Sequence, residues 1–128
     1  MTVPAARPPA LPVLVVDDNE EIRVGVREVL EDQGFRVVTA ANGREALDLM
    51  GSQLPCLILL DLIMPTMDGW QFMSAQRASG AFRDIPIVIL SALAHKSESR
   101  TVGAAAVLGK PIDTKRLLEV VRANCNGG

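Results

Sequence analysis

The sequence predicts an α/β fold of the doubly wound type, in which five parallel strands form one sheet with helices on both faces. Short apolar runs alternate with amphipathic segments from Pro12 onward. The central runs are apolar at nearly every position, as burial on both faces of a parallel sheet requires. Polar residues follow four of the five runs, and the strand ends of such a sheet meet at the edge where ligands bind.

The first strand–helix unit has clear boundaries. The predicted strand Val13–Val16 is a run of valine and leucine that stops abruptly at Asp17 and Asp18. A helix follows, because apolar residues recur at helical spacing, and Gly34 ends it in the position that glycine favours after a helix. The apolar face of this helix comprises Ile22, Val26, Val29 and Leu30.

The next two strands are predicted at Phe35–Ala40 and Cys56–Leu60, and the second of them ends in Asp61. Between them, Asn42-Gly43 turns the chain into a short helix, which Gly51 and Pro55 end. Its apolar positions are Ala46, Leu47 and Met50.

In the last third of the chain, a helix is predicted over about residues 69–79 and a strand at Ile87–Leu90, which ends in Ser91. The polar stretch 95–100 is expected to hold a short helix. A fifth strand, Ala106–Leu108, leads to Lys110. The final helix is expected to begin near Asp113, a favourable N-cap, and to run to Ala123.

Length and composition narrow the classes of protein. A chain of 128 residues fits one domain, which we expect at 12–125 between a disordered proline-rich tail, 1–11, and a flexible C-terminus, 126–128. The net charge of −2 argues against a nucleic-acid partner, which needs a basic patch. No apolar run approaches the roughly 20 residues of a membrane span, and no signal peptide is visible, so we expect no membrane partner and a cytoplasmic location. In that setting Cys56 and Cys125 are expected to be separate reduced thiols.

Five polar residues are predicted to converge on one sheet edge. They are the residues that follow four of the strands: Asp17, Asp18, Asp61, Ser91 and Lys110. Three neighbouring carboxylates repel one another unless a cation neutralises them, and oxygen ligands suit Mg²⁺. A lysine and a serine beside them suit phosphoryl oxygens, so the cluster predicts a metal site that also accepts a phosphoryl group.

Four segments in chain order resemble the receiver domain of two-component response regulators of the chemotaxis-protein type. The resemblance covers about residues 12–124 and implies a flavodoxin-like sheet with strand order 2-1-3-4-5. The matching segments are VLVVDDNEEIR (Val13–Arg23), LILLDLIMPTMDGW (Leu57–Trp70), IPIVILSA (Ile85–Ala92) and GAAAVLGKP (Gly103–Pro111).

The resemblance also assigns roles at the site. It implies that Asp61 is the phospho-acceptor, that Ser91 hydrogen-bonds the phosphoryl group, and that Lys110 pairs with it across a cis bond to the next proline. It implies a Mg²⁺ ion held by Asp17, Asp18, Asp61 and the backbone carbonyl of Ile63. The implied partners are a histidine kinase or phosphotransfer protein and a downstream regulatory protein, with the domain a monomer or weak dimer.

Three features depart from the family pattern. Val107 stands where the family usually has an aromatic ring that moves on phosphorylation. The stretch after Ser91 is shorter than usual, so we expect a short, displaced or mobile fourth helix. Ile63 and Leu93 are expected to shield an aspartyl phosphate from water and slow its hydrolysis.

The leading hypothesis is a phosphorylatable signalling switch that is not an enzyme beyond its own phosphorylation and slow dephosphorylation. A receiver fold that binds partners without switching is the first alternative, which Val107 and the short segment after Ser91 favour. A Mg²⁺-dependent phosphohydrolase is the second. It is disfavoured because such enzymes usually carry an acid two residues after the nucleophile, where this chain has Ile63.

Overall fold

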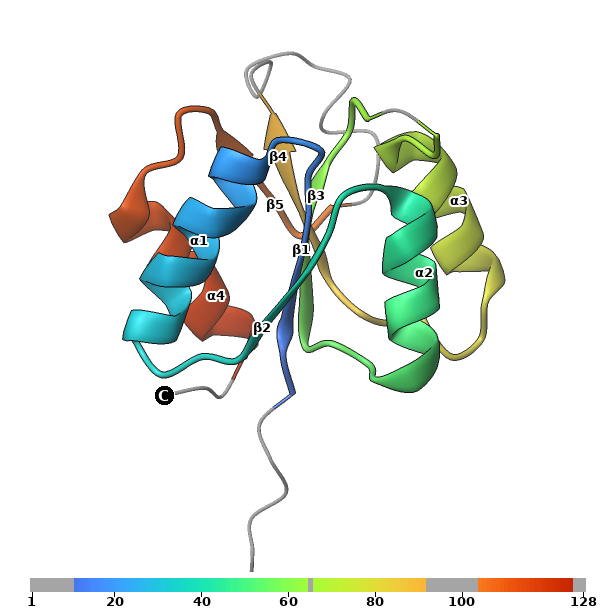
Figure 1. The fold of residues 1–128 in the computed structure, drawn as a ribbon. Coiled ribbons are helices and arrows are strands. Elements are labelled where there is room, and N and C mark those ends of the chain that lie inside the picture. The colour runs from blue at the N-terminus through green and yellow to red at the C-terminus, as the bar shows by residue number, and fades with distance from the viewer. Residues whose placement is uncertain (1–10, 65, 92–103, 126–128) are drawn as a thin grey trace, which may run out of the picture.

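The computed structural model describes residues 11–64, 66–91 and 104–125. Within them, five parallel strands form one sheet in the order β2-β1-β3-β4-β5 (Figure 1). The strands are β1 (Val13–Val16), β2 (Val37–Ala40), β3 (Leu57–Asp61), β4 (Ile87–Ser91) and β5 (Ala106–Gly109). The helices of the described part are α1 (Glu20–Asp32), α2 (Gly43–Ser52), α3 (Gly69–Ala78) and α4 (Thr114–Asn124). The predicted fold class and strand order are confirmed.

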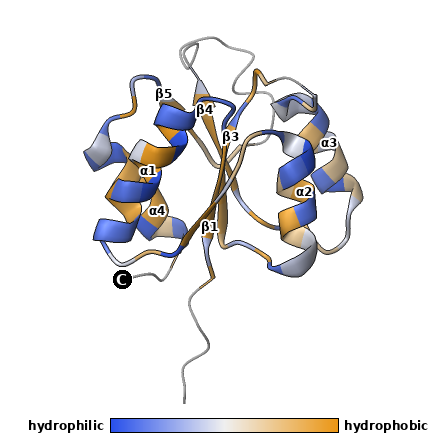
Figure 2. Cartoon of the chain, viewed as in Figure 1, coloured by the Kyte–Doolittle hydropathy of each residue, from blue (hydrophilic) through white to orange (hydrophobic). Residues whose placement is uncertain are grey.

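The helices cover both faces of the sheet, with α1 and α4 on one side and α2 and α3 on the other (Figure 1). Successive residues of a strand point to opposite faces, so the central strands supply two separate cores. In β1, Val13 and Val15 belong to the core under α1 and α4, while Leu14 and Val16 belong to the core under α2 and α3. Figure 2 shows the hydrophobic residues gathered in the strands and on the inner sides of the helices.

Helix α1 begins and ends at residues whose chemistry favours those positions. The side-chain oxygen of Asn19 accepts hydrogen bonds from the backbone N–H groups of Glu21 and Ile22, as an N-cap does. At the other end Gly34 has a φ of 89°, a conformation that glycine adopts without strain. These caps fix the position of α1 relative to the end of β1, where Asp17 lies.

Strand bounds differ from the expected ones by one or two residues, and two of the differences concern the site. β2 begins at Val37, because the backbone N–H of Phe35 instead donates to the carbonyl of Leu30 in α1 at 3.0 Å. β3 and β4 each extend one residue beyond the apolar run, to Asp61 and Ser91. Because these two polar residues belong to the sheet itself, strand pairing positions their backbones.

Several expectations concern residues outside the described ranges. These are the tail before Leu11, the C-terminal segment 126–128, the fourth helix expected at 95–100, and Leu93. Val107 is described: it lies in β5, half-buried, and packs against the core under α2 and α3. No helix in the described part of the chain is both long enough and apolar enough to cross a lipid bilayer.

The expectation that Cys56 and Cys125 are separate reduced thiols is wrong. The two residues are 69 positions apart in sequence and form a disulfide. Cys125 follows α4 directly, and α4 packs back onto the sheet so that the two Cα atoms lie 5.6 Å apart. That separation is typical of disulfide-bonded residues. Spacing along the chain did not indicate the pairing, because the tertiary packing of α4 creates it.

Candidate functional site

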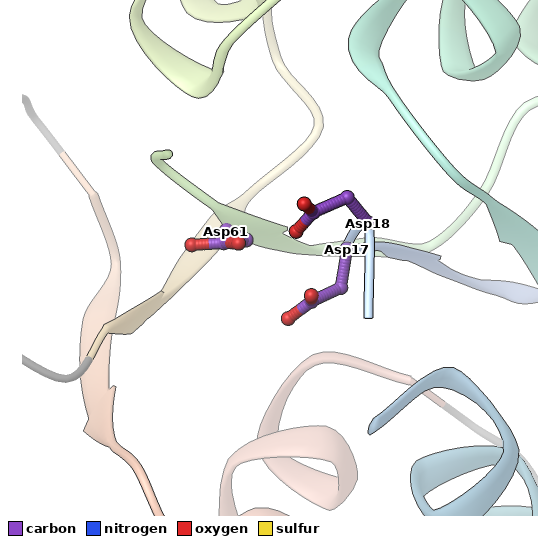
Figure 3. Close-up of side chains that lie close together, drawn as sticks. All are labelled: Asp17, Asp18 and Asp61. Atoms are coloured by element: carbon purple, nitrogen blue, oxygen red, sulfur yellow. The ribbon is translucent and has the colours of Figure 1, made fainter. Parts of the chain in front are cut away.

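Three carboxylates gather at the carboxyl edge of the sheet (Figure 3). Asp17 and Asp18 follow β1, and Asp61 is the last residue of the adjacent strand β3. One oxygen from each of the three lies within 4.8 Å of the others. Asp17 and Asp61 are buried and Asp18 is exposed, so the cluster reaches solvent through Asp18. The predicted grouping of the three residues is therefore found.

Four different segments hold Asp17. Its backbone N–H donates to the carbonyl of Ala40 at 3.1 Å, and its own carbonyl accepts a 2.7 Å hydrogen bond from Nη1 of Arg23. Its Oδ1 accepts the backbone N–H of Asn19 at 2.9 Å. Its buried Oδ2 faces Nζ of Lys110 at 2.8 Å and has no well-aligned hydrogen-bond donor among the described residues. Together, these contacts hold the backbone and the carboxylate of Asp17 in one orientation.

The side chain of Asp61 makes the same two kinds of contact as that of Asp17, but both are longer. Its Oδ1 accepts the backbone N–H of Ile63 at 3.2 Å, and its Oδ2 lies 3.6 Å from Nζ of Lys110. Burial raises the pKa of Asp61 above its usual value, and repulsion from Asp17 raises it further. The Ile63 N–H and the Lys110 ammonium oppose that rise in pKa. A cation bound at this position would stabilise the ionised carboxylate.

Lys110 and Ser91 lie at the ends of the next two strands. The Lys110 ammonium reaches back between Asp17 and Asp61, and its backbone N–H donates to the carbonyl of Ser91 at 3.1 Å. Ser91 is buried at the end of β4. This strand lies between β3, which carries Asp61, and β5, which precedes Lys110. The Lys110–Pro111 peptide bond is cis, as the family resemblance implied.

Ile63 lies two residues beyond the end of β3. Its backbone N–H contacts Asp61, and its side chain is 73% exposed. The role expected for its carbonyl as a metal ligand stays a prediction. Of the two side chains expected to shield an aspartyl phosphate, only Ile63 is described, since Leu93 lies outside the described ranges.

Sequence reasoning missed two residues that support the site. Arg23 lies within the first matching segment but received no role, although its guanidinium fixes the Asp17 carbonyl. Gly69 was noted only as a helix start. A Cβ atom at Gly69 would lie 2.6 Å from the carbonyl oxygen of Asp61 and 2.6 Å from Cα of Leu62. The start of α3 therefore packs directly against the end of β3, which only a residue without a side chain permits.

The residues present fit a hard divalent cation. Such ions prefer oxygen ligands, and this site offers carboxylate oxygens from Asp17, Asp18 and Asp61. A buried carboxylate oxygen with no well-aligned donor, Oδ2 of Asp17, is costly unless a positive partner completes its environment. Lys110 provides that partner in this structure, and a cation beside the three carboxylates would add a second.

A parallel sheet in the order 2-1-3-4-5, with an acidic cluster and a lysine at its carboxyl edge, defines a receiver-type signalling domain. The chain also matches the family model described as the response regulator receiver domain, over residues 13–122. It therefore belongs to the response regulator receiver domain family.

Individual relatives agree with this family. The chain is 38% identical over 114 residues to response regulator Rre1 of Synechocystis sp., a match that covers 86% of this chain and 49% of the relative. The chain thus spans about half the length of that relative. Protein PilG of Pseudomonas aeruginosa is 33% identical over 117 residues, covering 89% of this chain and 87% of PilG. The solved structure of chemotaxis protein CheY4 of Vibrio cholerae has 36% identity and a TM-score of 0.79, covering 89% of this chain and 98% of that one.

Proposed function

We propose that this receiver domain is a phosphorylation-controlled switch that accepts a phosphoryl group on Asp61 and then presents an altered surface to a partner. The observation that carries the proposal is the contrast within one cluster. Asp61 is loosely held beside the firmly fixed Asp17, the exposed Asp18 and the Lys110 ammonium. Phosphoryl transfer requires positioning and neutralisation of charge, and this arrangement offers both.

In the proposed reaction, a carboxylate oxygen of Asp61 attacks the phosphorus of a phosphohistidine. The bond between phosphorus and the ring nitrogen breaks, and the nitrogen keeps the electron pair. A small acyl phosphate would donate in the same way, with a carboxylate as the leaving group. Lys110 and the Ser91 hydroxyl would contact the phosphoryl oxygens of the product. Beyond this step and slow hydrolysis of the product, the domain would have no enzymatic activity.

We propose that Mg²⁺ is the cofactor, held by Asp17, Asp18, Asp61 and the carbonyl of Ile63. When bound, such an ion offsets the negative charge of the carboxylates and of the phosphoryl oxygens. The chain supports this by fixing Asp17 through Arg23 and Asn19 before any ion binds. That preparation lowers the conformational cost of assembling the site.

The proposed domain spans residues 12–125, between the tail 1–11 and the segment 126–128. Its proposed partners are a histidine kinase or phosphotransfer protein, which donates, and a downstream regulatory protein, which reads the modified surface. No nucleic acid or membrane is among the proposed partners, and the domain would act as a monomer or weak dimer. We place it in the cytoplasm, because phosphohistidine donors are made there from ATP.

The test is incubation of the full chain with acetyl phosphate and Mg²⁺, followed by intact-mass measurement. The expected product carries one phosphoryl group, which maps to Asp61. Asp61→Asn should reduce the rate at least about 100-fold, because the nucleophile is lost. Asp48→Asn is the matched control, since it removes an exposed carboxylate on α2, away from the site, and should leave the rate unchanged. Chelation of the metal with EDTA should abolish incorporation.

Other outcomes would contradict the switch. A folded wild-type protein that incorporates no phosphoryl group would support the interaction module that does not switch. Continuous release of inorganic phosphate over many turnovers would support the phosphohydrolase. Incorporation that persists in Asp61→Asn would mean that another residue is the acceptor.

A further inference from the structure

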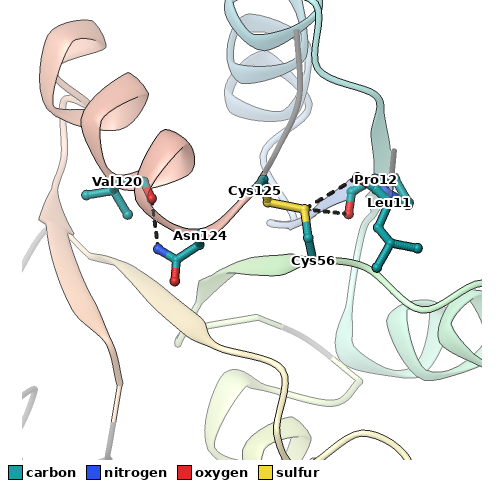
Figure 4. Close-up of a disulfide and its surroundings, with 6 residues drawn as sticks. All are labelled: Leu11, Pro12, Cys56, Val120, Asn124 and Cys125. Atoms are coloured by element: carbon teal, nitrogen blue, oxygen red, sulfur yellow. Dashed lines mark hydrogen bonds between the residues drawn. A yellow bond between two sulfur atoms is a disulfide. The ribbon is translucent and has the colours of Figure 1, made fainter. Parts of the chain in front are cut away.

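The disulfide lies at the end of the sheet opposite the acidic site, because β3 begins directly after Cys56 and ends at Asp61. Figure 4 shows the disulfide and its surroundings. Cys56 directly precedes β3, and Cys125 is the C-cap of α4. The backbone N–H of Cys56 also donates to the carbonyl of Pro12 at 2.9 Å, at the point where the chain enters β1. The disulfide therefore ties the last turn of α4 to both of the strands that carry the acidic cluster.

The two cysteines of the disulfide differ in their exposure to solvent. Cys125 is 6% exposed and belongs to the core under α1 and α4. Cys56 is only partly buried and lies at the margin of that core. Because thiol–disulfide exchange requires direct approach of a thiolate to one sulfur, the accessible point of attack is Sγ of Cys56.

The surroundings of Cys56 also suit its reduced form. Its Sγ lies 3.4 Å from the carbonyl oxygen of Leu11 and 3.5 Å from that of Pro12 (dashed in Figure 4). A disulfide sulfur carries no hydrogen, so in the oxidised form these are close contacts without a donor. Once Cys56 is a thiol, its S–H can donate to either carbonyl. The same pocket of backbone therefore accommodates both redox states.

Other contacts hold α4 in place independently of the disulfide. Leu117 and Val121 are buried in the core between α4 and the sheet. Nη2 of Arg122 donates a 2.9 Å hydrogen bond to Oε1 of Gln33 at the end of α1. Opening the disulfide would therefore loosen the last turn of α4 without detaching the helix.

We propose that Cys56 and Cys125 form a reversible redox modification site, whose reductant is a protein or small-molecule dithiol. A thiolate of the dithiol attacks Sγ of Cys56, and Cys125 leaves as a thiolate and takes up a proton. The second thiolate of the dithiol then displaces Cys56. The pair gains two electrons and two protons, and the dithiol becomes a disulfide.

The location of the protein supports reversibility over a permanent crosslink. In the cytoplasm, where we place this domain, lasting disulfides are uncommon and those present are usually transient or redox-sensing. The redox site does not depend on phosphorylation of Asp61, which lies at the other end of the sheet. Both redox forms should incorporate a phosphoryl group from acetyl phosphate if the proposed function holds.

The expected effect is a change in stability and in the mobility of one helix turn. The disulfide joins residues 69 positions apart, and closing a loop of that size restricts the unfolded chain considerably. Reduction should lower the midpoint of thermal unfolding by about 10 °C. Amide hydrogen exchange should accelerate most in the last turn of α4, while the buried amides of β3 should accelerate only as far as the loss of global stability requires.

The experiment uses the full chain equilibrated in glutathione buffers of increasing oxidised fraction, then with dithiothreitol under native conditions. Alkylation by iodoacetamide and intact mass count the thiols, and thermal unfolding and hydrogen exchange follow the structure. The expected result is an intramolecular disulfide in oxidising buffer that folded protein loses to dithiothreitol, with the stability change described above. The double variant Cys56→Ser, Cys125→Ser should have the unfolding midpoint and hydrogen exchange of the reduced protein, and dithiothreitol should change neither.

Each contrary result overturns the proposal. Two alkylated thiols at every glutathione ratio would show that the pair does not oxidise. Resistance of the folded protein to dithiothreitol would make the disulfide a permanent crosslink. A disulfide between two chains, or an unchanged unfolding midpoint, would also contradict it. Should the double variant not fold, the oxidised and reduced forms of the wild-type protein still decide the question.

Discussion

The β1–α1 and β3–α3 loops begin alike and then diverge. In each, the residue two positions after an aspartate donates its backbone N–H to Oδ1 of that aspartate. Asn19 donates to Asp17 at 2.9 Å, and Ile63 donates to Asp61 at 3.2 Å. After β1 that residue is an asparagine whose side chain caps a helix, whereas after β3 it is an isoleucine whose side chain is 73% exposed.

Under the proposed function, this difference separates a fixed metal ligand, Asp17, from the carboxylate that reacts, Asp61. The β1–α1 loop is immobilised by side chains, among them Arg23 on the Asp17 carbonyl and Lys110 on its carboxylate. The β3–α3 loop leaves Asp61 with its nearest ammonium at 3.6 Å. Two carboxylates on neighbouring strands of one sheet can thus have different roles, because the loop that follows each strand determines how tightly the carboxylate is held.

The largest expected effect concerns the packing beneath Asp61. Gly69→Ala would place a Cβ atom 2.6 Å from the Asp61 carbonyl oxygen, so backbone must move, and we expect a loss of about 2–4 kcal/mol in the free energy of unfolding. Gly25→Ala is the matched control, because its Cβ would meet nothing within 4 Å inside α1. It should gain about 0.5–1 kcal/mol through helix propensity. Urea denaturation measures both, and equal effects would refute the close approach.

An intermediate effect is expected from loosening the β1–α1 loop. Arg23→Gln removes the 2.7 Å hydrogen bond to the Asp17 carbonyl and should weaken Mg²⁺ binding about tenfold, measured by titration calorimetry. Loss of a positive charge near carboxylates would by itself favour cation binding, so weaker binding would isolate the positioning effect. Arg27→Gln, on the exposed Arg27–Glu31 pair, is the control and should change nothing. Tighter binding in Arg23→Gln would show that charge, not position, decides.

The smallest expected effect comes from making the two loops more alike. Ile63→Asn gives the β3–α3 loop the residue that the β1–α1 loop has, and places a polar side chain beside Asp61. We expect the aspartyl phosphate to decay roughly threefold faster or more, because an amide can orient an attacking water that isoleucine cannot. The half-life after removal of acetyl phosphate measures this, with Ile63→Leu as the apolar control. Equal half-lives would show that the exposed isoleucine does not shield the phosphoryl group.

The fold could be predicted from sequence because its signals are local. Continuous apolar runs such as Val13–Val16 indicated strands buried on both faces, and Gly34 and Asp113 indicated helix ends. The error at Phe35 arose because its backbone N–H bonds to the carbonyl of Leu30 in α1, and an apolar side chain does not indicate where the backbone bonds. The disulfide was missed because it depends on where α4 docks, which no local pattern encodes.

The site could be predicted in part for a related reason. Strand ends at one edge of a parallel sheet must lie near one another, so Asp17, Asp18, Asp61 and Lys110 were expected together and are found together. The unequal restraint of Asp17 and Asp61 was not predictable. It depends on an arginine six positions away and on hydrogen-bond lengths, which sequence does not specify.

Gly69 has one more consequence, through the residue beside it. Trp70 directly follows Gly69 at the start of α3, is 43% exposed, and is the single tryptophan of a chain without tyrosine. Because Gly69 abuts the backbone of Asp61, the indole ring is attached to the segment that packs against the end of β3. The intrinsic emission of the unaltered chain, excited beyond the phenylalanine band, therefore originates at the start of α3 and carries no background from the other elements.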